Sequence, residues 1–568
     1  MEYIILFAVF FIIFVIYMIR CIIEDGRKKR LFERTLRTEY GKRKEKNYPD
    51  GRLASIQKTC LADEDREGFI DDITARDLEI DRLFVRIDRT FSSAGEESLY
   101  RMLRAPLLSA AKIDDRRSVI SWIDSHEEER IGLQLLYAGI GKTGKHSVQD
   151  YLGPLLEMED RSNAGHFAVL LLMAASMILA FFNTGIGLIC FLVLFIYNLL
   201  TYFREKKTID PYITTFGYVL RLLAAAGSIS EKLEGAGDGR GGELLSGMGK
   251  RIGDDKKVFA GFERFSFLVT AENAMSSSPM DLVMEYLRMG FHLNLIKFNS
   301  MLGIMKEHSK ELTEMTETAG YIEACISVAE FVKSLQTSCE PVLSEEQKGP
   351  GLKTEGLFHP LVRDCVPNDV DISECMLLTG SNASGKSTFI RTVAVSQLLS
   401  QTIGYACAKS FESGIFRIYT SMALRDDPEG GRSYFIVETE SLKRIVDAAS
   451  DGGCNVMCFI DEVLRGTNTA ERIAASSCIL ESLSDMGVFC FAATHDLELC
   501  SLLLGVYADY HFEETVMDDD ISFDYLLRKG GANGRNAIKL LSMMGYPDEV
   551  VKRSEERCAL FLSEGRWE

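Results

Sequence analysis

The stretch 377–388, LLTGSNASGKST, decides the fold of the C-terminal part of the chain. An apolar run leads into Gly380-x-x-x-x-Gly385-Lys386-Ser387, which is the spacing of a phosphate-binding P-loop. Glycines let backbone N–H groups curl around phosphates, the lysine reaches the terminal phosphate oxygens, and the serine hydroxyl ligates Mg²⁺. The following FIRTVAVSQLL predicts a helix whose positive end points at the anion. A strand, a glycine loop and a helix in this order predict nucleotide binding.

Two further apolar segments end in polar residues suited to the same site. VMCFIDE (456–462) predicts a buried strand, after which Asp461 would hold Mg²⁺ and Glu462 would orient and deprotonate the attacking water. VFCFAATH (488–495) predicts another buried strand, and His495 at its end would sense the γ-phosphate. A lone histidine at a strand end is more often held by backbone groups. Three strand-end polar sites in sequence nevertheless favour a parallel-sheet ATPase.

These motifs define a predicted set of ligands for ATP and Mg²⁺, the two expected cofactors. The predicted nucleotide-binding residues are the loop itself and one histidine further along the chain: Gly380, Ser381, Asn382, Ala383, Ser384, Gly385, Lys386, Ser387, Thr388 and His511. The predicted Mg²⁺ ligands are Ser387 and Asp461.

The segments between and after these strands closely resemble the MutS family, whose ATPase domain is of the ABC-type P-loop class. The resemblance is carried by GRSYFIVETESLKRIVDAA (431–449), DEVLRGTNTAERIAAS (461–476) and ATHDLEL (493–499), by the lead-in HPLVRDCVPNDVDI (359–372), and by the tail 523–556. The family's characteristic positions are held by Asp426, Asp427, Gly431, Ser433 and Glu438, and by Asn468 where serine is commoner. The resemblance is strong over about 357–556.

The resemblance implies that two subunits share each ATP site. Ser433, at the start of its helix, would contact the γ-phosphate bound by the other subunit, so the implied catalytic set is Glu462, His495 and Ser433. The simpler role of Ser433 is to cap its helix, and both roles can hold at once. The lead-in has no clear counterpart of the aromatic residue that stacks on adenine in many members.

Weaker similarity to the family extends upstream. Residues 73–107 resemble the start of the family's helical core, and residues 320–341 resemble the core helix that returns to the ATPase. Between them lie two uncharged apolar runs, 167–182 and 186–203. They predict a transmembrane helical hairpin, in which the second run has spanning length and the first is marginal. A buried helix pair of a soluble protein is the alternative.

The N-terminus predicts a third membrane span. YIILFAVFFIIFVIYMI (3–19) lacks a basic region before it and a small-residue cleavage site after it, so a retained anchor is favoured over a signal peptide. Eleven Lys and Arg residues within 20–46 place that flank in the cytoplasm. With Met1 outside, the ATPase domain is then cytoplasmic. The basic flank predicts contact with anionic membrane lipid, with nucleic acid as the alternative.

Composition fits a cytosolic body on a membrane anchor. Fourteen Cys without C-x-x-C spacing predict reduced, buried thiols, and no zinc motif is visible. The formal net charge of −19 requires any DNA contact to come from a local basic patch. The glycine-rich stretch 233–256 predicts a flexible loop.

The predicted fold is an α/β C-terminal ATPase domain of the P-loop, ABC-type class, preceded by an all-α MutS-like core with three transmembrane helices. Its predicted parts are 1–20, an N-terminal transmembrane anchor; 21–60, a basic juxtamembrane segment; 61–166, the first part of the helical core; 167–203, the transmembrane hairpin; 204–345, the second part of the core or lever; 346–530, the ATPase domain; and 531–568, a C-terminal helical dimerisation segment.

Three functions are compatible with this organisation. The first is a membrane-anchored, MutS-like ATPase that hydrolyses ATP in a composite homodimer site and couples it to binding of mismatched or structured DNA. The second is an ATP-driven dimeric membrane signalling or interaction module without DNA binding. The third, a transporter motor, is disfavoured because the spans are few and residues 431–434 read GRSY rather than Leu-Ser-Gly-Gly-Gln. Mismatch reading is disfavoured because the family's N-terminal domain with its Phe-x-Glu wedge is not found.

Overall fold

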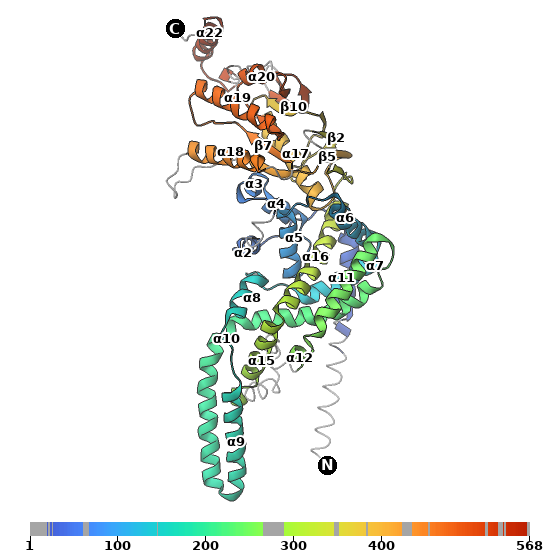
Figure 1. Ribbon diagram of the computed structural model, residues 1–568, viewed down its shortest axis with the longest axis vertical. Coiled ribbons are helices and arrows are strands. Elements are labelled where there is room, and N and C mark those ends of the chain that lie inside the picture. Colours follow the sequence, from blue (N-terminus) through green and yellow to red (C-terminus); the bar gives the residue numbers. More distant parts are fainter. Residues whose placement is uncertain are drawn as a thin grey trace. The chain divides into compact units, whose positions relative to one another are not determined.

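The computed structural model (Figure 1) divides into two compact units. The helical unit comprises Met1–Ala62, Val85–Arg101 and Asp115–Ser334, and the α/β unit comprises Asp63–Phe84, Met102–Asp114 and Leu335–Glu568. The structure describes residues 20, 23–24, 26–60, 67–144, 146–264, 289–345, 351–381, 384–422, 434–451, 455–516, 521–531, 538, 541–542 and 544–564. The predicted first span at 3–19 lies outside the described residues.

The main sheet of the α/β unit has six strands in the order β10-β9-β4-β8-β7-β6. Every pair in it is parallel except the edge pair of β9 with β10. Its strands are β4 (Cys375–Thr379), β6 (Arg417–Ser421), β7 (Val456–Asp461), β8 (Phe489–Ala493), β9 (Tyr507–Val516) and β10 (Ile521–Lys529). The three motif-bearing strands β4, β7 and β8 are buried on both faces, which explains their continuous apolar sequences.

A second sheet and several helices complete the α/β unit. The second sheet has the order β1-β5-β2-β3, with β1 (Val342–Ser344), β2 (Leu352–Leu357), β3 (Asn368–Ile372) and β5 (Ser410–Gly414). The helices are α3 (Asp72–Asp77), α17 (Lys386–Thr402), α18 (Tyr434–Ser450), α19 (Thr469–Asp485), α20 (Glu498–Leu502) and α22 (Asp548–Glu564). Asn468 caps α19, because its side chain accepts the Glu471 N–H at 3.1 Å.

The upstream helix α3 is fastened to the main sheet. The Asp77 carboxylate accepts hydrogen bonds from the Thr420 hydroxyl at 2.6 Å and from the Met422 N–H at 2.9 Å, at the end of β6. The Asp77 carbonyl accepts a bond from Arg391 of α17 at 2.8 Å. One residue of α3 therefore joins a sheet strand to the helix that follows the P-loop.

The helical unit is built around long helices and paired buried charges. Its helices are α2 (Arg52–Thr59), α7 (Glu127–Ile140), α8 (Val148–Glu157), α9 (Ala164–Phe182), α10 (Thr184–Glu234), α11 (Gly239–Lys257), α12 (Ala260–Glu263), α15 (Leu293–Glu307), α16 (Ser309–Lys333), and parts of α4 (Ile80–Ile87), α5 (Ser93–Arg104) and α6 (Ala110–Ser125). Arg52 pairs with Glu96 and Lys46 with Asp88, each at 2.6 Å. Such pairing offsets the cost of burying charge.

The prediction of a flexible loop at 233–256 was wrong, because most of this stretch is the helix α11. A Cβ on Gly249 would lie 2.7 Å from the Leu233 Cβ, and one on Gly253 would lie 2.6 Å from the Ser230 Oγ. Both neighbours belong to α10. These glycines therefore allow two helices to pack closely, which a compositional reading of glycine and polar residues cannot distinguish from a loop.

The helices α9 and α10 form an antiparallel hairpin in the helical unit (Figure 1). Asn183 joins them, and its side chain accepts the Ile186 N–H at the start of α10. Ala164–Phe182 and Thr184–Ile209 are long and apolar enough to cross a membrane, each with a mean hydropathy of 2.2. Only 11% and 17% of their most apolar windows are buried. A helix pair in a soluble core would instead bury most of these side chains.

Candidate functional site

The parallel register of the main sheet brings three sequence motifs to one edge. Leu378 on β4 pairs with Ala493 on β8, and Ala493 pairs with Asp461 on β7. The ladder continues past the strand ends, because the Thr494 N–H donates to the Leu378 carbonyl at 3.0 Å and the Glu462 N–H donates to the Ala493 carbonyl at 2.9 Å. The P-loop, the strand-end histidine and the strand-end carboxylates therefore meet, as the carboxyl ends of parallel strands do.

The P-loop is shaped to present a lysine and a helix N-terminus. Lys386 is buried, and its Nζ donates to the Gly380 carbonyl at 2.6 Å and the Ser381 carbonyl at 2.7 Å. Gly385 has φ 100° and begins α17 without a side-chain cap. The first N–H groups of α17 can therefore turn toward an anion, whose negative charge the helix dipole also favours.

His495 and Glu462 lie in contact beside this lysine. The His495 Nε2 is 3.0 Å from the Glu462 Oε1 and 3.4 Å from the Lys386 Nζ. Arg465 holds the other Glu462 oxygen at 2.8 Å. Burial, and then the charge of Lys386, lower the pKa of His495, so the imidazole is neutral at physiological pH. Glu462 has φ 62°, a strained conformation of the kind found at functional sites.

The chemistry of Ser387 and Asp461 fits Mg²⁺. The Ser387 hydroxyl hydrogen-bonds the Asp461 carboxylate. Burial raises the pKa of Asp461, and the Ser387 bond and Lys386 oppose that shift. Among the described residues, no group of three His, Cys, Asp or Glu side chains is suited to a metal. One carboxylate and one hydroxyl are enough for Mg²⁺, which keeps several waters and binds phosphate oxygens.

Two contacts that hold this site in place were not predicted from the sequence. Buried Glu438 on α18 accepts the Arg465 N–H at 3.1 Å and so holds the loop that follows Glu462. Arg472 on α19 forms two bonds to Asp496, at 2.8 and 2.6 Å, and so holds the residue next to His495. Glu438 was recognised only as a family position. The Arg472–Asp496 pair carries no local signal, because its members lie 24 residues apart.

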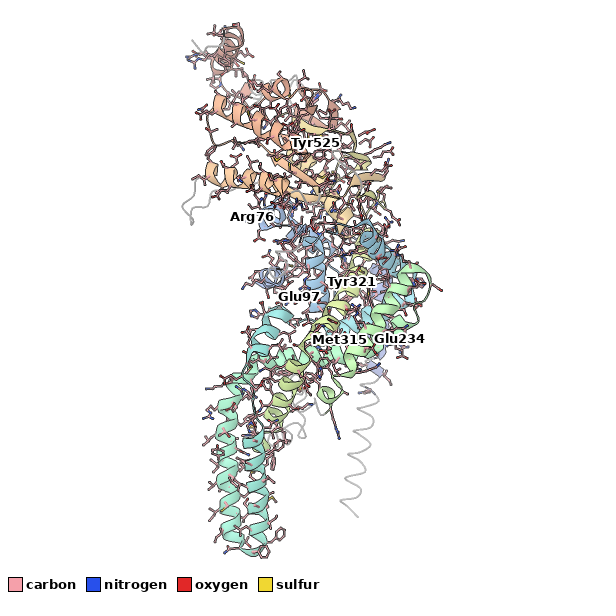
Figure 2. The ribbon with its side chains drawn as sticks, viewed as in Figure 1. Arg76, Glu97, Glu234, Met315, Tyr321 and Tyr525 are labelled. Atoms are coloured by element: carbon pink, nitrogen blue, oxygen red, sulfur yellow. The ribbon has the colours of Figure 1, made fainter. Side chains whose placement is uncertain are left out.

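A pocket of about 370 Å³ lies beside the P-loop. Tyr525 of β10, labelled in Figure 2, lines it together with Gly385 and Thr388. This residue is 43% exposed. Asn368 fixes this part of β10, because its amide donates to the Tyr525 carbonyl at 2.9 Å and accepts the Leu527 N–H at 2.7 Å. The aromatic side chain beside the P-loop thus comes from β10, whereas the lead-in 359–372 offers no clear counterpart of the family's stacking aromatic.

The remaining predicted residues are distributed around the loop or lie beyond the described residues. Ser384 is buried and donates to the Ser381 carbonyl at 2.8 Å. His511 pairs with Thr379 across β9 and β4, but its Nδ1 is 2.8 Å from the Gly530 carbonyl, which holds the ring at the edge strand pair. Asn382, Ala383, Asp426, Asp427, Gly431 and Ser433 lie outside the described residues.

Comparison with known proteins identifies the domain that carries this site. Residues 376–561 match the family model described as MutS domain V. The DNA mismatch repair protein MutS 2 of Haloarcula marismortui is 38% identical over 187 residues, which cover 32% of this chain and 19% of that protein. The DNA mismatch repair protein MutS of Natronomonas pharaonis is 32% identical over 271 residues, which cover 46% of this chain and 31% of that protein.

A bacterial relative shows the same partial match. The DNA mismatch repair protein MutS of Thermotoga maritima is 30% identical over 275 residues, which cover 46% of this chain and 33% of that protein. The chain thus spans between about a fifth and a third of the length of these relatives. Its C-terminal α/β region contains an ATPase domain of the MutS type.

Proposed function

We propose that this chain is a membrane-anchored, MutS-like ATPase that binds and hydrolyses ATP with Mg²⁺ in a composite dimer site. One observation carries the proposal: at one edge of the main sheet, the His495 Nε2 lies 3.0 Å from the Glu462 Oε1 and 3.4 Å from the Lys386 Nζ. A lysine for phosphate and a carboxylate for water are groups that enzymes use in phosphoryl transfer to water, and here a histidine contacts both of them.

The residues divide the chemistry among them. Lys386 would exchange the carbonyls of Gly380 and Ser381 for the β- and γ-phosphate oxygens, and Ser387 and Asp461 would hold Mg²⁺. When bound, Mg²⁺ neutralises charge on the phosphates. Glu462 would take the proton of the attacking water, since a carboxylate positioned beside a bound water can act as a general base. His495 would hold Glu462 toward that water while remaining neutral beside Lys386.

Two substitutions test this assignment. Lys386→Ala should abolish nucleotide binding, because it removes the phosphate's cation. Glu462→Gln should keep ATP binding and lower turnover by at least about 100-fold, the scale of a positioned general base. Binding is measured with a fluorescent ATP analogue and turnover by phosphate release. Unchanged turnover in Glu462→Gln would remove Glu462 from the role of base.

The composite site is the part of the proposal that rests on resemblance. Ser433 stands directly before α18, whose first-turn residues Phe435 and Ile436 are exposed apolar side chains suited to a partner surface. Ser433→Ala should lower turnover while ATP still binds. Mixing Ser433→Ala subunits with Lys386→Ala subunits should restore one working site in each heterodimer. Absence of any rescue would mean that each subunit works alone.

The α9–α10 hairpin supports the membrane anchor in this proposal. A membrane-impermeant thiol probe should label Asn183→Cys at the hairpin tip from outside sealed cells, and should label Ser162→Cys before the hairpin only after permeabilisation. The background for both is a variant with the exposed Cys190 and Cys478 replaced by serine. If both positions are equally protected from the thiol probe, and if carbonate extracts the protein from the membrane, the hairpin is not a membrane insertion.

We propose DNA, mismatched or structured, as the partner coupled to ATP turnover, on the strength of the relatives' names. The exposed apolar hairpin favours the alternative of a dimeric membrane signalling module without DNA. Turnover of the protein in lipid nanodiscs, with homoduplex, mismatched and branched DNA across a salt series, separates the two. Salt-sensitive stimulation by DNA supports the first, because basic residues release counterions on binding. A flat response to every DNA supports the second.

A further inference from the structure

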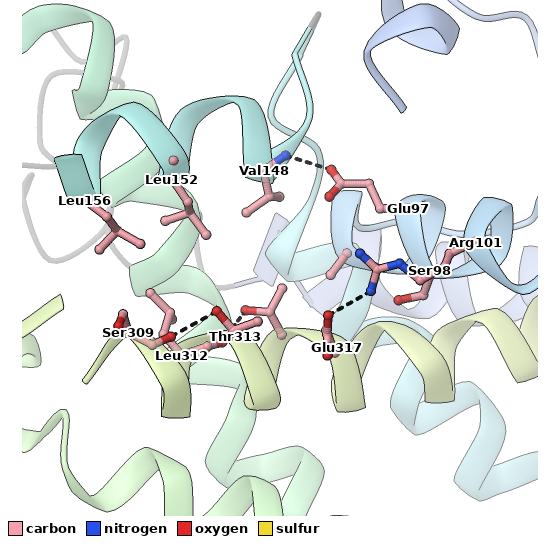
Figure 3. Close-up of a pocket in the computed structure, with 13 residues that line it drawn as sticks. Glu97, Ser98, Arg101, Val148, Leu152, Leu156, Ser309, Leu312, Thr313 and Glu317 are labelled. Atoms are coloured by element: carbon pink, nitrogen blue, oxygen red, sulfur yellow. Dashed lines mark hydrogen bonds and ion pairs between the residues drawn. The ribbon is translucent and has the colours of Figure 1, made fainter. Parts of the chain in front are cut away.

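The helical unit contains a pocket unrelated to the nucleotide site, between α5, α8 and α16 (Figure 3). Its volume is about 320 Å³, which is within the range of small-molecule sites. Val148 and Leu152 of α8 and Leu312 of α16 supply apolar walls. Glu97 and Arg101 of α5 and Glu317 of α16 supply charge. Apolar walls with a few convergent polar groups are typical of ligand sites.

Glu97 is the carboxylate of this pocket that forms no ion pair in the part of the chain that the structure describes. Glu97 is only 7% exposed. Its Oε1 accepts a hydrogen bond from the Val148 N–H at 2.7 Å, which is drawn in Figure 3. Among the described residues, no donor is hydrogen-bonded to its other oxygen. Burial raises the pKa of Glu97 to about 7, and the Val148 N–H and the charges of Arg52 and Arg101 oppose that shift. A buried carboxylate without a directly bound cation is costly to ionise.

The other two charges of the pocket cancel. The Arg101 Nη1 lies 2.7 Å from the Glu317 Oε1, so this pair contributes no net charge. Ionised Glu97 then gives the lining a net charge of −1. Arg101 donates to Glu317 (Figure 3), and its charge acts on Glu97 without an ion pair between these two described residues.

We propose that this pocket binds a small organic cation, namely a primary ammonium group attached to an apolar body. The ammonium donates to the second oxygen of Glu97, and the body lies against Leu152 and Leu312. An ammonium there stabilises the ionised carboxylate, since opposite charges attract strongly where water is excluded. The site is independent of ATP and of the proposed hydrolysis.

The first test compares three probes of equal length by isothermal titration calorimetry. Hexylamine, hexanol and hexanoate are titrated at pH 8 into the full chain in lipid nanodiscs. Hexylamine should bind at least about 10-fold more tightly than hexanol, the scale of one charge-assisted hydrogen bond, and hexanoate should not bind. Glu97→Gln should remove that preference. Glu314→Gln, on the same helix α16 but outside the lining, should retain it.

The second test fills the pocket without disturbing its walls. Gly153 of α8 lines the pocket, and a Cβ there meets no atom within 4 Å, so Gly153→Leu adds a side chain whose first atom has room. This variant should lose hexylamine binding. Gly139→Leu on α7, where a Cβ also meets no atom, should retain it. Hexylamine binding that survives both Gly153→Leu and Glu97→Gln, or equal binding of hexylamine and hexanoate, would overturn the proposal.

Discussion

Two apolar regions of this chain have similar compositions and opposite surroundings. Every residue of β7 from Val456 to Ile460 is at most 4% exposed, because strands flank it and helices cover it. In the apolar stretches of the α9–α10 hairpin, Ala164–Phe182 and Thr184–Ile209, most side chains are not buried, and Leu171 is 72% exposed. An apolar sequence therefore indicates a segment from which water is excluded. Whether protein or lipid surrounds the segment depends on the residues packed against it in the folded structure.

The largest expected effect contrasts one residue from each region. Phe459 on β7 is fully buried and stacks on Phe491 with ring centroids 5.2 Å apart. Phe459→Ala should lower the free energy of unfolding of the α/β unit by about 3–5 kcal/mol, because it leaves a cavity. Leu171→Ala should change the stability in detergent by less than about 0.5 kcal/mol, as surface substitutions do. Urea unfolding followed by circular dichroism measures both.

A large cost for Leu171→Ala in detergent would contradict this contrast. It would mean that protein atoms cover that face of α9, and the hairpin would then be a second packed core rather than a membrane insertion.

The next largest effect concerns buried charge in the helical unit. The pKa of Glu97 rises from an ordinary 4.5 to about 7, so the folded protein keeps a proton that the unfolded chain has lost between these values. The resulting stability is fully present below pH 4.5 and is lost as pH rises through 7, amounting to about 3 kcal/mol. The fluorescence of buried Trp122 reports unfolding at pH 5.5 and pH 8.

Glu97→Gln is the control for this pH effect. The amide oxygen can still accept the Val148 N–H but does not titrate, so stability should vary less between pH 5.5 and pH 8. An unchanged pH dependence in this variant would assign the effect to other groups.

A smaller effect on stability should distinguish the glycines of α11 that contact α10 from those that have open space around them. Gly249→Ala should destabilise the helical unit by about 1–3 kcal/mol, because the added methyl group meets the Leu233 side chain of α10. Gly247→Ala on the same helix meets nothing within 4 Å and should stabilise by up to about 1 kcal/mol through helix propensity. Thermal unfolding of the two variants gives the sign directly. Stabilisation by both would show that α10 and α11 are not closely packed in solution.

The smallest expected effect tests the support of His495. Asp496→Asn keeps the size of the side chain but weakens its two bonds to Arg472, so His495 should be held less well against Glu462. We expect kcat to fall by about 10-fold, which is 1.4 kcal/mol, with little change in the KM for ATP. Asp485→Asn at the end of α19 should leave both constants unchanged. A rise in KM alone would place Asp496 in nucleotide binding instead.

Much of the nucleotide site could be predicted because its chemistry is local. A glycine loop must be contiguous to wrap a phosphate, and a carboxylate or histidine at the end of an apolar strand stands next to its own strand in the sequence. The main sheet's order was not readable in this way. β8 follows β7 in the chain but lies between β7 and β4, and that placement is what brings His495 between Glu462 and Lys386.

The sequence by itself therefore determined the P-loop, the order of the motif-bearing strands along the chain and the apolar character of the hairpin. Only the tertiary structure decided that Tyr525 lines the pocket beside Gly385, that Glu97 is buried with a raised pKa, and that the glycines of α11 pack against α10. The physical reason is the distance along the chain over which each interaction acts. Dihedral preferences and hydrophobic patterns act between near neighbours, whereas burial and close contact depend on residues that folding brings together from distant positions.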